Sequence, residues 1–245
     1  MIEVEDLTKL YKDKKRGQVR AVDNVSFTCK PGEVYGLLGP NGAGKTTTLR
    51  ILSTAIKATS GSARVMGHEV VKDAEQVRRS VGFLAANTGL YGRLTPREIL
   101  RYFGALHGMP RAKVDARIAE LAATFDMEEF LTRPCDKLST GMKQKVNIAR
   151  TVLHEPPVIV FDEPTGGLDV LTSRTIVQFI RKCRDEQKTV ILSTHIMAEV
   201  GKLCDRLGVI HNGRLFYTGA VSDLRERHGD DLEDAFILLI GEAAA

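Results

Sequence analysis

The stretch GPNGAGKTT (residues 39–47) has the pattern of a phosphate-binding loop: a glycine, four residues, then glycine, lysine and threonine. It follows the apolar run EVYGLL and leads into KTTTLRIL, so a strand should end and a helix begin here. In such a loop, backbone N–H groups surround a phosphate, Lys45 reaches the β- and γ-oxygens, and the Thr46 hydroxyl ligates Mg²⁺. The alternative is a glycine-rich turn that only starts a helix. The predicted nucleotide-binding residues are Gly39, Pro40, Asn41, Gly42, Ala43, Gly44, Lys45, Thr46 and Thr47.

Two further apolar runs end in residues that could act on the same phosphates. PPVIVFDEP ends a predicted strand at Asp162, which would hold Mg²⁺ through water. Glu163 follows at once, where a carboxylate can polarise the water that attacks a γ-phosphate. VILSTH brings His195 to the same edge of the sheet as a γ-phosphate sensor. A solvated acidic turn and a structural histidine are the alternatives, but beside a phosphate loop the pattern favours Lys45, Glu163 and His195 as catalytic residues.

A second helix start with phosphate-binding features occurs in LSTGMKQKVNIAR (138–150). Ser139, Thr140 and Gly141 stand directly before a run of good helix formers. Such a start leaves backbone N–H groups free and presents the positive end of the helix dipole, which favours an anion. The spacing alone does not show which phosphate this second start would bind.

Composition and charge are those of an ordinary soluble globular protein. The 245 residues are 43% hydrophobic and 27% charged. The net charge of +4 is spread along the chain, whereas nucleic-acid binding requires clustered basic residues. The basic stretch KDKKRGQVR (12–20) is therefore predicted to be a solvated loop. The cysteines have neither metal-site nor disulfide spacing, so we expect reduced and mostly buried thiols at Cys29, Cys135, Cys183 and Cys204.

No targeting or membrane segment is expected. The first residues, MIEVEDLTKLY, are acidic and strand-like. The best apolar runs, PPVIVF and AFILLIG, are far shorter than the roughly 18–20 residues that a membrane span needs. We therefore expect a cytoplasmic protein that neither crosses a membrane nor leaves the cell on its own.

Short apolar runs alternate with helix-period segments, which predicts an α/β fold. The first part is rich in strands, with turns expected at KPGE (30–33) and TSGS (59–62), and the middle, about 87–155, is almost entirely helical. The predicted strands are 2–6, 20–28, 33–38, 81–84, 157–162, 188–193, 207–211 and 214–218. The predicted helices are 44–54, 95–107, 111–124, 140–153, 170–184, 196–202 and 220–228.

The ordered motifs GPNGAGKTT, LSTGM, FDEP, GGLD and STH together resemble the nucleotide-binding domain of an ABC transporter, over about residues 2–228. The resemblance implies a P-loop NTPase core of ABC type, with an N-terminal antiparallel β subdomain. It also implies that the helical segment at about 87–155 is the inserted signature subdomain of a domain spanning 1–228, followed by a short C-terminal extension, 229–245. ATP and Mg²⁺ are the implied cofactors.

The resemblance also gives the second helix start a role. LSTGM corresponds to the ABC signature, which clasps the γ-phosphate bound to the other subunit, so a homodimer with ATP at its interface is implied. The implied contacts are Ser139, Thr140, Gly141 and Met142. Thr140 and Met142 stand where glycine and glutamine are usual, but Ser139 and Gly141, the closest phosphate contacts, are retained, so binding is expected to persist.

Three further positions carry over from the family. Tyr11 falls where an aromatic ring stacks on adenine, with a packed strand-end tyrosine as the alternative, and Asp169 matches a residue lying across the dimer interface. The glutamine expected after the strand VGFL aligns with Ala86, which has no oxygen for Mg²⁺ or water. Asn87 could substitute as a metal ligand if the loop shifts by one residue.

Three functions are compatible with these motifs. The first is an ATPase subunit that drives a separate integral membrane permease from the cytoplasmic face of the cell membrane. The second is a soluble ABC ATPase acting on nucleic acid or ribosomes; the single cassette and the lack of a basic patch or a heptad array argue against it. The third is a regulator without turnover, which should have lost Glu163 or His195. We therefore expect no nucleic-acid partner.

Within transporters, three segments resemble the exporter branch that pairs with ABC-2-type permeases: residues 94–109, 163–176 and 231–241. Residues 138–150 and 193–215 are especially similar to the ATP-binding subunit of sodium-efflux ABC transporters. Sodium efflux is therefore the expected function, and a drug or lipid exporter of the same branch is the alternative.

Overall fold

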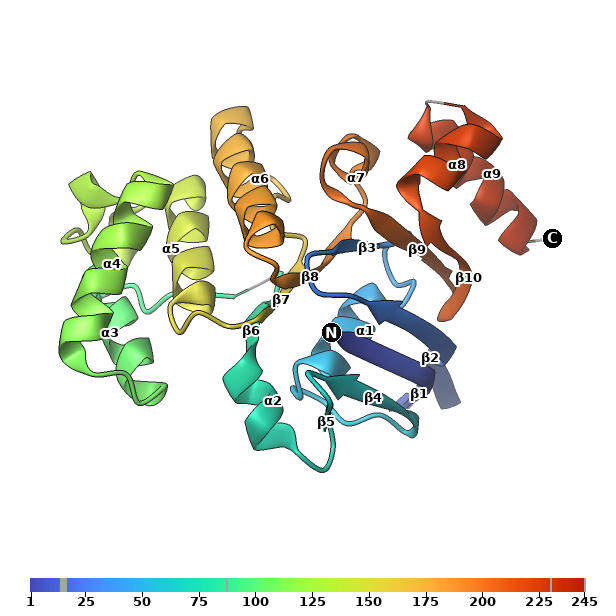
Figure 1. Ribbon diagram of the computed structural model, residues 1–245, viewed down its shortest axis with the longest axis horizontal. Helices are drawn as coiled ribbons and strands as arrows, with labels where there is room; N and C mark the ends of the chain where they lie inside the picture. The colour runs from blue at the N-terminus through green and yellow to red at the C-terminus, as the bar shows by residue number, and fades with distance from the viewer. Residues whose placement is uncertain (14–16, 87, 230, 245) are drawn as a thin grey trace.

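The computed structural model describes residues 1–13, 17–86, 88–229 and 231–244, and within these the strands form two sheets (Figure 1). The larger sheet has the order β10–β9–β3–β8–β7–β6, and all its pairs are parallel except β10 with β9. Its strands are β3 (Val34–Leu38), β6 (Val81–Leu84), β7 (Val158–Asp162), β8 (Thr189–Thr194), β9 (Arg206–His211) and β10 (Arg214–Ala220). The α/β class predicted from the sequence is confirmed.

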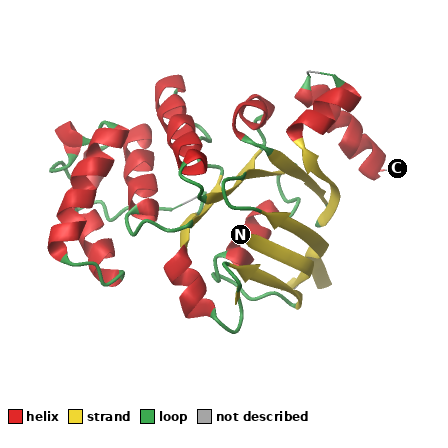
Figure 2. Cartoon of the chain, viewed as in Figure 1, coloured by secondary structure: helices red, strands yellow, loops and turns green. Residues whose placement is uncertain are grey.

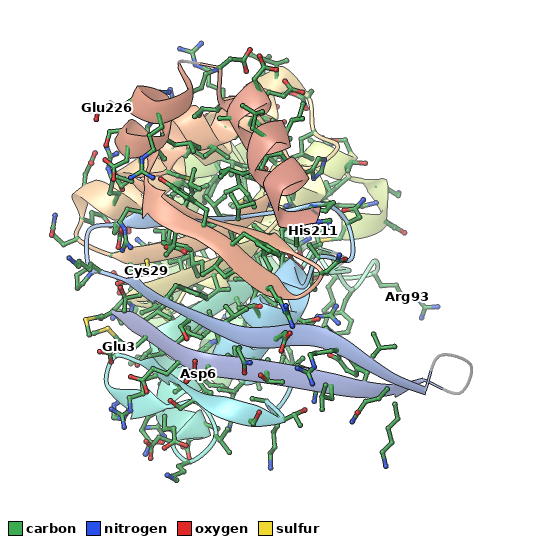
Figure 3. All side chains as sticks on the ribbon, turned by 90° about the vertical axis from the view of Figure 1, so that its right-hand side faces the viewer. Glu3, Asp6, Cys29, Arg93, His211 and Glu226 are labelled. Atoms are coloured by element: carbon green, nitrogen blue, oxygen red, sulfur yellow. The ribbon has the colours of Figure 1, made fainter. Side chains whose placement is uncertain are left out.

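The smaller sheet is antiparallel and has the order β2–β1–β4–β5. Its strands are β1 (Ile2–Asp13), β2 (Gly17–Cys29), β4 (Ser60–Val65) and β5 (His68–Glu69). Figure 3 shows the long β1–β2 pair running below β9 and β10, with Glu3 and Asp6 along β1, Cys29 towards one end of β2 and His211 by the turn after β9.

Helix α1 (Lys45–Leu52) packs in the core between the two sheets, and the helices that follow residue 95 pack in the core on the opposite face of the larger sheet. Successive strand residues point to opposite faces. Val158 and Val160 of β7 therefore pack in the core that holds α1, whereas Ile159 and Phe161 pack in the other core. The helices on that second face are α5 (Thr140–Val152), α6 (Val170–Asp185), α7 (Met197–Leu203), α8 (Val221–His228) and α9 (Leu232–Ala244).

Helices α3 (Pro96–Leu106), α4 (Arg111–Phe125) and α5 gather to one side of the sheets (Figure 2). A capping box starts α3: the Glu98 N–H donates to Thr95 Oγ1 (3.3 Å) and the Thr95 N–H donates to Glu98 Oε2 (2.8 Å). Gly104 lets α3 approach α4 closely, since a Cβ there would lie 2.5 Å from Val114 Cγ2. Short 3₁₀ helices, Glu128–Phe130 and Cys135–Lys137, connect α4 to α5.

Two sequence predictions about the first third of the chain were wrong. TSGS does not form a turn, because its last three residues open β4, in which Ser60 and Ser62 pair with β1. Gly61 (φ 78°) makes this possible, since a Cβ would lie 2.2 Å from the Asp6 carbonyl oxygen. The basic stretch 12–20 is not simply a loop: its described ends pair in β1 and β2, and their side chains stay largely exposed.

Two strands and two α-helices had no counterpart among the predicted ones. They are β4, β5, α9 and α2 (Ala74–Ser80), whose single buried residue is Val77. Helix α9 packs on β9 and β10 and contributes Leu232 and Ala235 to the core. The division of the chain at residue 228 stays a prediction. No helix in the described parts of the chain combines the length and the apolar character needed to cross a membrane.

The four cysteines are free and buried, as the sequence predicted. Burial raises the pKa of each thiol, to about 12 for Cys183.

Candidate nucleotide-binding and catalytic site

Residues 39–44 form a tight loop between β3 and α1. Gly42 (φ 81°) and Gly44 (φ 114°) have left-handed backbones, which glycine adopts without strain. A Cβ on Gly44 would also lie 2.5 Å from the Ala21 carbonyl oxygen, so only glycine fits there. The loop encloses a small hollow lined by residues 41–47 together with Ala21 and Glu163.

Lys45 places a cation inside this loop. The residue is only 5% exposed, and its Nζ donates to the carbonyl oxygens of Gly39 (2.6 Å) and Pro40 (3.1 Å). Burial lowers the pKa of Lys45, while the nearby carboxylates of Glu163 and Asp162 act in the opposite direction. The ammonium group therefore lies among oxygen acceptors at the position that the motif predicts for binding phosphate oxygens.

Asp162, at the end of β7, is 1% exposed and connects the loop to the sheet. Its Oδ1 accepts hydrogen bonds from the Thr46 hydroxyl (3.0 Å) and the Ser193 hydroxyl (2.6 Å). Its Oδ2 is buried and has no hydrogen-bond partner among the described residues. An uncompensated carboxylate oxygen beside a threonine hydroxyl fits a hard cation, since Mg²⁺ prefers oxygen ligands.

Glu163 and His195 follow neighbouring parallel strands, β7 and β8, and their side chains meet. His195 Nδ1 lies 3.3 Å from Glu163 Oε1. Glu163 has a left-handed backbone (φ 51°), which is uncommon outside glycine and marks a special turn. Its N–H donates to both the carbonyl (3.2 Å) and the hydroxyl (3.1 Å) of Ser193. The structure therefore brings the predicted pair together beside the hollow.

Sequence reasoning missed Ser193. Its hydroxyl is fully buried, donates to Asp162 and accepts the Glu163 N–H, so it fixes both acidic residues at once. The register of the parallel pair, with Asp162 opposite Ser193, produces this contact.

Gln144 of α5 was missed as well. Its Nε2 donates to the Pro164 carbonyl (2.7 Å), which fixes α5 to the segment directly after Glu163.

The residues of LSTGM form the start of α5. Ser139 is the N-cap, and its Oγ accepts the Met142 N–H (3.2 Å). Ser139 and Thr140 are exposed, and Met142 is half-buried. None of residues 139–142 lines the hollow of the phosphate loop. The two predicted phosphate-binding helix starts are therefore separate on one chain.

Gly141 packs against the start of α6. A Cβ there would lie 2.8 Å from Thr172 Oγ1 and 3.3 Å from Asp169 Oδ2. Asp169 caps α6, since its carboxylate accepts the Thr172 N–H (2.9 Å) and hydroxyl (2.7 Å). These two hydrogen bonds lower the pKa of Asp169.

Tyr11 lies on β1 with 40% of its surface exposed, and the Lys9 ammonium sits 5.1 Å from its ring centroid. An exposed ring remains available for stacking on a base, although that role stays a prediction. Asn87, the predicted metal ligand, lies outside the described residues. Beside it, Thr88 donates its hydroxyl to the Ala85 carbonyl (2.8 Å) and accepts the Asn147 side-chain amide (3.0 Å) at its own carbonyl.

Comparisons with known proteins agree with this geometry. The family model described as ABC transporter matches residues 22–166. The chain is 43% identical, over 97% of each sequence, to the ABC transporter ATP-binding protein NatA of Bacillus subtilis (strain 168). It is 32% identical to the linearmycin resistance ATP-binding protein LnrL of the same organism, over 100% of this chain and 80% of that protein.

A solved structure adds the nucleotide. It is a dimeric post-hydrolysis state of the ATP-binding cassette MJ0796 bound to ADP and Pi, with a TM-score of 0.82 and 27% identity over 90% of this chain and 99% of that one. Phosphate loop, acidic strand end and family match lead to one conclusion: this chain belongs to the ABC transporter family, as an ATP-hydrolysing, ATP-binding subunit of the exporter type.

Proposed function

We propose that two copies of this chain bind ATP at a shared interface and drive export through a separate ABC-2-type permease in the cell membrane. The observation that carries the proposal is the contact between Glu163 and His195 (3.3 Å) beside the hollow of the phosphate loop. A carboxylate there can accept a hydrogen bond from the water that attacks the γ-phosphate. Sodium ions are the proposed cargo.

The proposed hydrolysis assigns one task to each group of residues. The backbone N–H groups of the loop and Lys45 hold the β- and γ-phosphates. Thr46 and Asp162 would hold Mg²⁺, which would neutralise phosphate charge when bound. Glu163 orients and polarises the attacking water, and His195, which contacts Glu163, would also contact the γ-phosphate. Tyr11 stacks on the adenine.

The partner copy completes each site in this proposal. Residues 139–142 lie outside their own chain's hollow, and the solved ATP-binding cassette with ADP and Pi is a dimer. The helix start of one chain is therefore assigned to the γ-phosphate held by the other, with Asp169 at the interface.

Glu163→Gln tests the catalytic assignment. It should keep ATP binding, nearly abolish hydrolysis and accumulate an ATP-bound dimer that elutes earlier in size-exclusion chromatography. Glu226→Gln, at an exposed position on α8, is the matched control and should hydrolyse ATP at the wild-type rate. Hydrolysis by Glu163→Gln within about threefold of wild type, a barrier change of roughly 0.6 kcal/mol, would exclude the role of Glu163.

Mixing two inactive variants tests the shared interface. Lys45→Ala removes a phosphate contact, and Ser139→Arg blocks the start of α5. A mixed dimer then holds one site with both defects and one with neither, so part of the ATPase activity should return. If mixing restores no ATPase activity and ATP induces no cross-link between the two chains, each chain forms its site alone.

The cargo needs a separate measurement. Support for sodium comes from the resemblance of residues 138–150 and 193–215 to sodium-efflux subunits and from the 43% identity to NatA. The similarity to a linearmycin resistance protein supports a drug exporter as the second candidate. Cells expressing the chain with its co-purifying membrane protein should extrude sodium, and the Glu163→Gln version should not. Drug resistance without sodium extrusion would favour the second candidate.

A further inference from the structure

Glu199 of α7 accepts two hydroxyl groups at a single carboxylate oxygen. Thr165 Oγ1 donates to Glu199 Oε2 over 2.7 Å, and Thr194 Oγ1 donates to the same oxygen over 3.4 Å. Both threonines are buried, with 3% of the surface of Thr165 and 2% of that of Thr194 exposed. The Ile196 N–H donates to Thr194 Oγ1 (3.0 Å), which fixes the orientation of that hydroxyl. The motifs assign no role to Thr165, Thr194 or Glu199, although Thr194 lies within STH.

These two threonines belong to the two segments that carry the proposed catalytic pair. Thr165 follows Glu163 by two residues, and Thr194 directly precedes His195. On the strand side, Ser193 already joins the segments by accepting the Glu163 N–H. On the helix side, Glu199 of α7 joins the same two segments through its hydrogen bonds with Thr165 and Thr194. The contact between Glu163 and His195 is therefore held from both sides.

We infer that Glu199 is a positioning residue that keeps the Glu163 and His195 segments at the separation that hydrolysis requires. The inference rests on the roles proposed above for that pair. A carboxylate accepts hydrogen bonds about twice as strongly as a neutral oxygen does, so it can hold both segments through one atom. Water attack depends on positions within about 1 Å, and a misplacement of that size can cost up to about a hundredfold in rate.

Substitution of a residue with this role should change the rate of turnover but not the affinity for nucleotide. The hydrogen bonds that Glu199 accepts from Thr165 and Thr194 do not involve the phosphate loop, where Lys45 and its neighbours in 41–47 are proposed to hold the nucleotide. Loss of the network should therefore lower kcat while the KM for ATP stays near the wild-type value. If these hydrogen bonds contributed only to stability, their loss would lower the melting temperature and leave kcat per folded molecule unchanged.

Thr165→Val and Thr165→Ser form the matched pair that tests the inference. Valine has the shape of threonine without the donor, whereas serine keeps the hydroxyl. We expect Thr165→Val to lower kcat about tenfold, equivalent to about 1.4 kcal/mol in barrier, with KM changed less than twofold. Thr165→Ser should recover at least half of the wild-type kcat. Should the valine variant not fold, Glu199→Gln gives the same split, because its neutral oxygen is a weaker acceptor for both threonines.

Glu163→Gln is measured alongside, so that the two failures can be told apart. If Glu163→Gln is inactive but Thr165→Val turns over at the wild-type rate, the inference about Glu199 is wrong and the proposed function stands. A Thr165→Ser variant as slow as Thr165→Val would also overturn it. Wild-type hydrolysis by Glu163→Gln would overturn the role of Glu163, and with it this inference.

Discussion

Removing one hydroxyl, in Ser193→Ala, should measure how strongly the buried Asp162 carboxylate depends on its hydrogen-bond donors. Ser193 is fully buried, and its hydroxyl makes the shorter of the two hydrogen bonds that Asp162 Oδ1 accepts, 2.6 Å against 3.0 Å. The Glu163 N–H still donates to the Ser193 carbonyl after the substitution, so the loss is concentrated on Asp162. A hydrogen bond to a charged group contributes about 1.5–3 kcal/mol. Ser193→Ala should therefore lower the free energy of unfolding by about 2 kcal/mol.

Urea unfolding followed by circular dichroism, without nucleotide, measures this loss. For a chain of this size, about 2 kcal/mol corresponds to a fall of about 4–8 °C in melting temperature, which thermal unfolding checks independently. Ser222→Ala is the control, because its hydroxyl contacts Asp223 (3.3 Å) at an exposed position, and it should change stability by less than about 0.5 kcal/mol. An equally small change in Ser193→Ala would refute the view that Ser193 stabilises the buried carboxylate.

Two other substitutions test the packing of the phosphate loop and the pH dependence of stability. A Cβ on Gly39 would lie 2.1 Å from the Ile210 carbonyl oxygen, so Gly39→Ala should weaken ATP binding at least tenfold in calorimetry. Gly89→Ala, which meets nothing within 4 Å, should bind like wild type, and equal affinity for both variants would contradict the steric argument. Burial, and secondarily the stacked ring of His107, lowers the pKa of His154 to about 4. Between the unfolded value of about 6.5 and pH 4, only the unfolded chain binds this proton, so stability falls as the pH falls. His154→Phe should flatten that decline in urea midpoints measured at pH 7 and pH 5, and an unchanged slope would exclude His154 as its source.

The site residues that could be predicted from the sequence are those that directly follow a predicted strand. Parallel strands of an α/β sheet end at one edge, so the residues that follow β7 and β8 were expected at that edge. For that reason Glu163 and His195 could be placed at one edge from the sequence, and the structure shows that their side chains are in contact. The phosphate loop could be found as well, because its glycines and Lys45 follow a fixed pattern between a strand and a helix.

Ser193 and Glu199 could not be found in this way. Ser193 acts through the register of β7 against β8, and Glu199 acts through the direction of α7, and residue spacing encodes neither. The strand β4 was missed because Gly61 and its serine neighbours are typical turn residues, yet pairing with β1 outweighs that local preference. Helix α2 buries only Val77, so its sequence has too little apolar periodicity to detect.

The buried cysteines make this chain convenient for thiol chemistry. Thiolates are the reactive form, and the raised pKa values leave very little thiolate near neutral pH. All four native thiols are shielded from reagents while the chain is folded. New cysteines at exposed Ser139 and Asn41 would then be the only sites that couple rapidly to a maleimide or to each other. Asn41 suits this better than Gly42, whose φ of 81° disfavours a side chain. The wild-type background can therefore carry spectroscopic labels and cross-links across the proposed interface without first being stripped of its own cysteines.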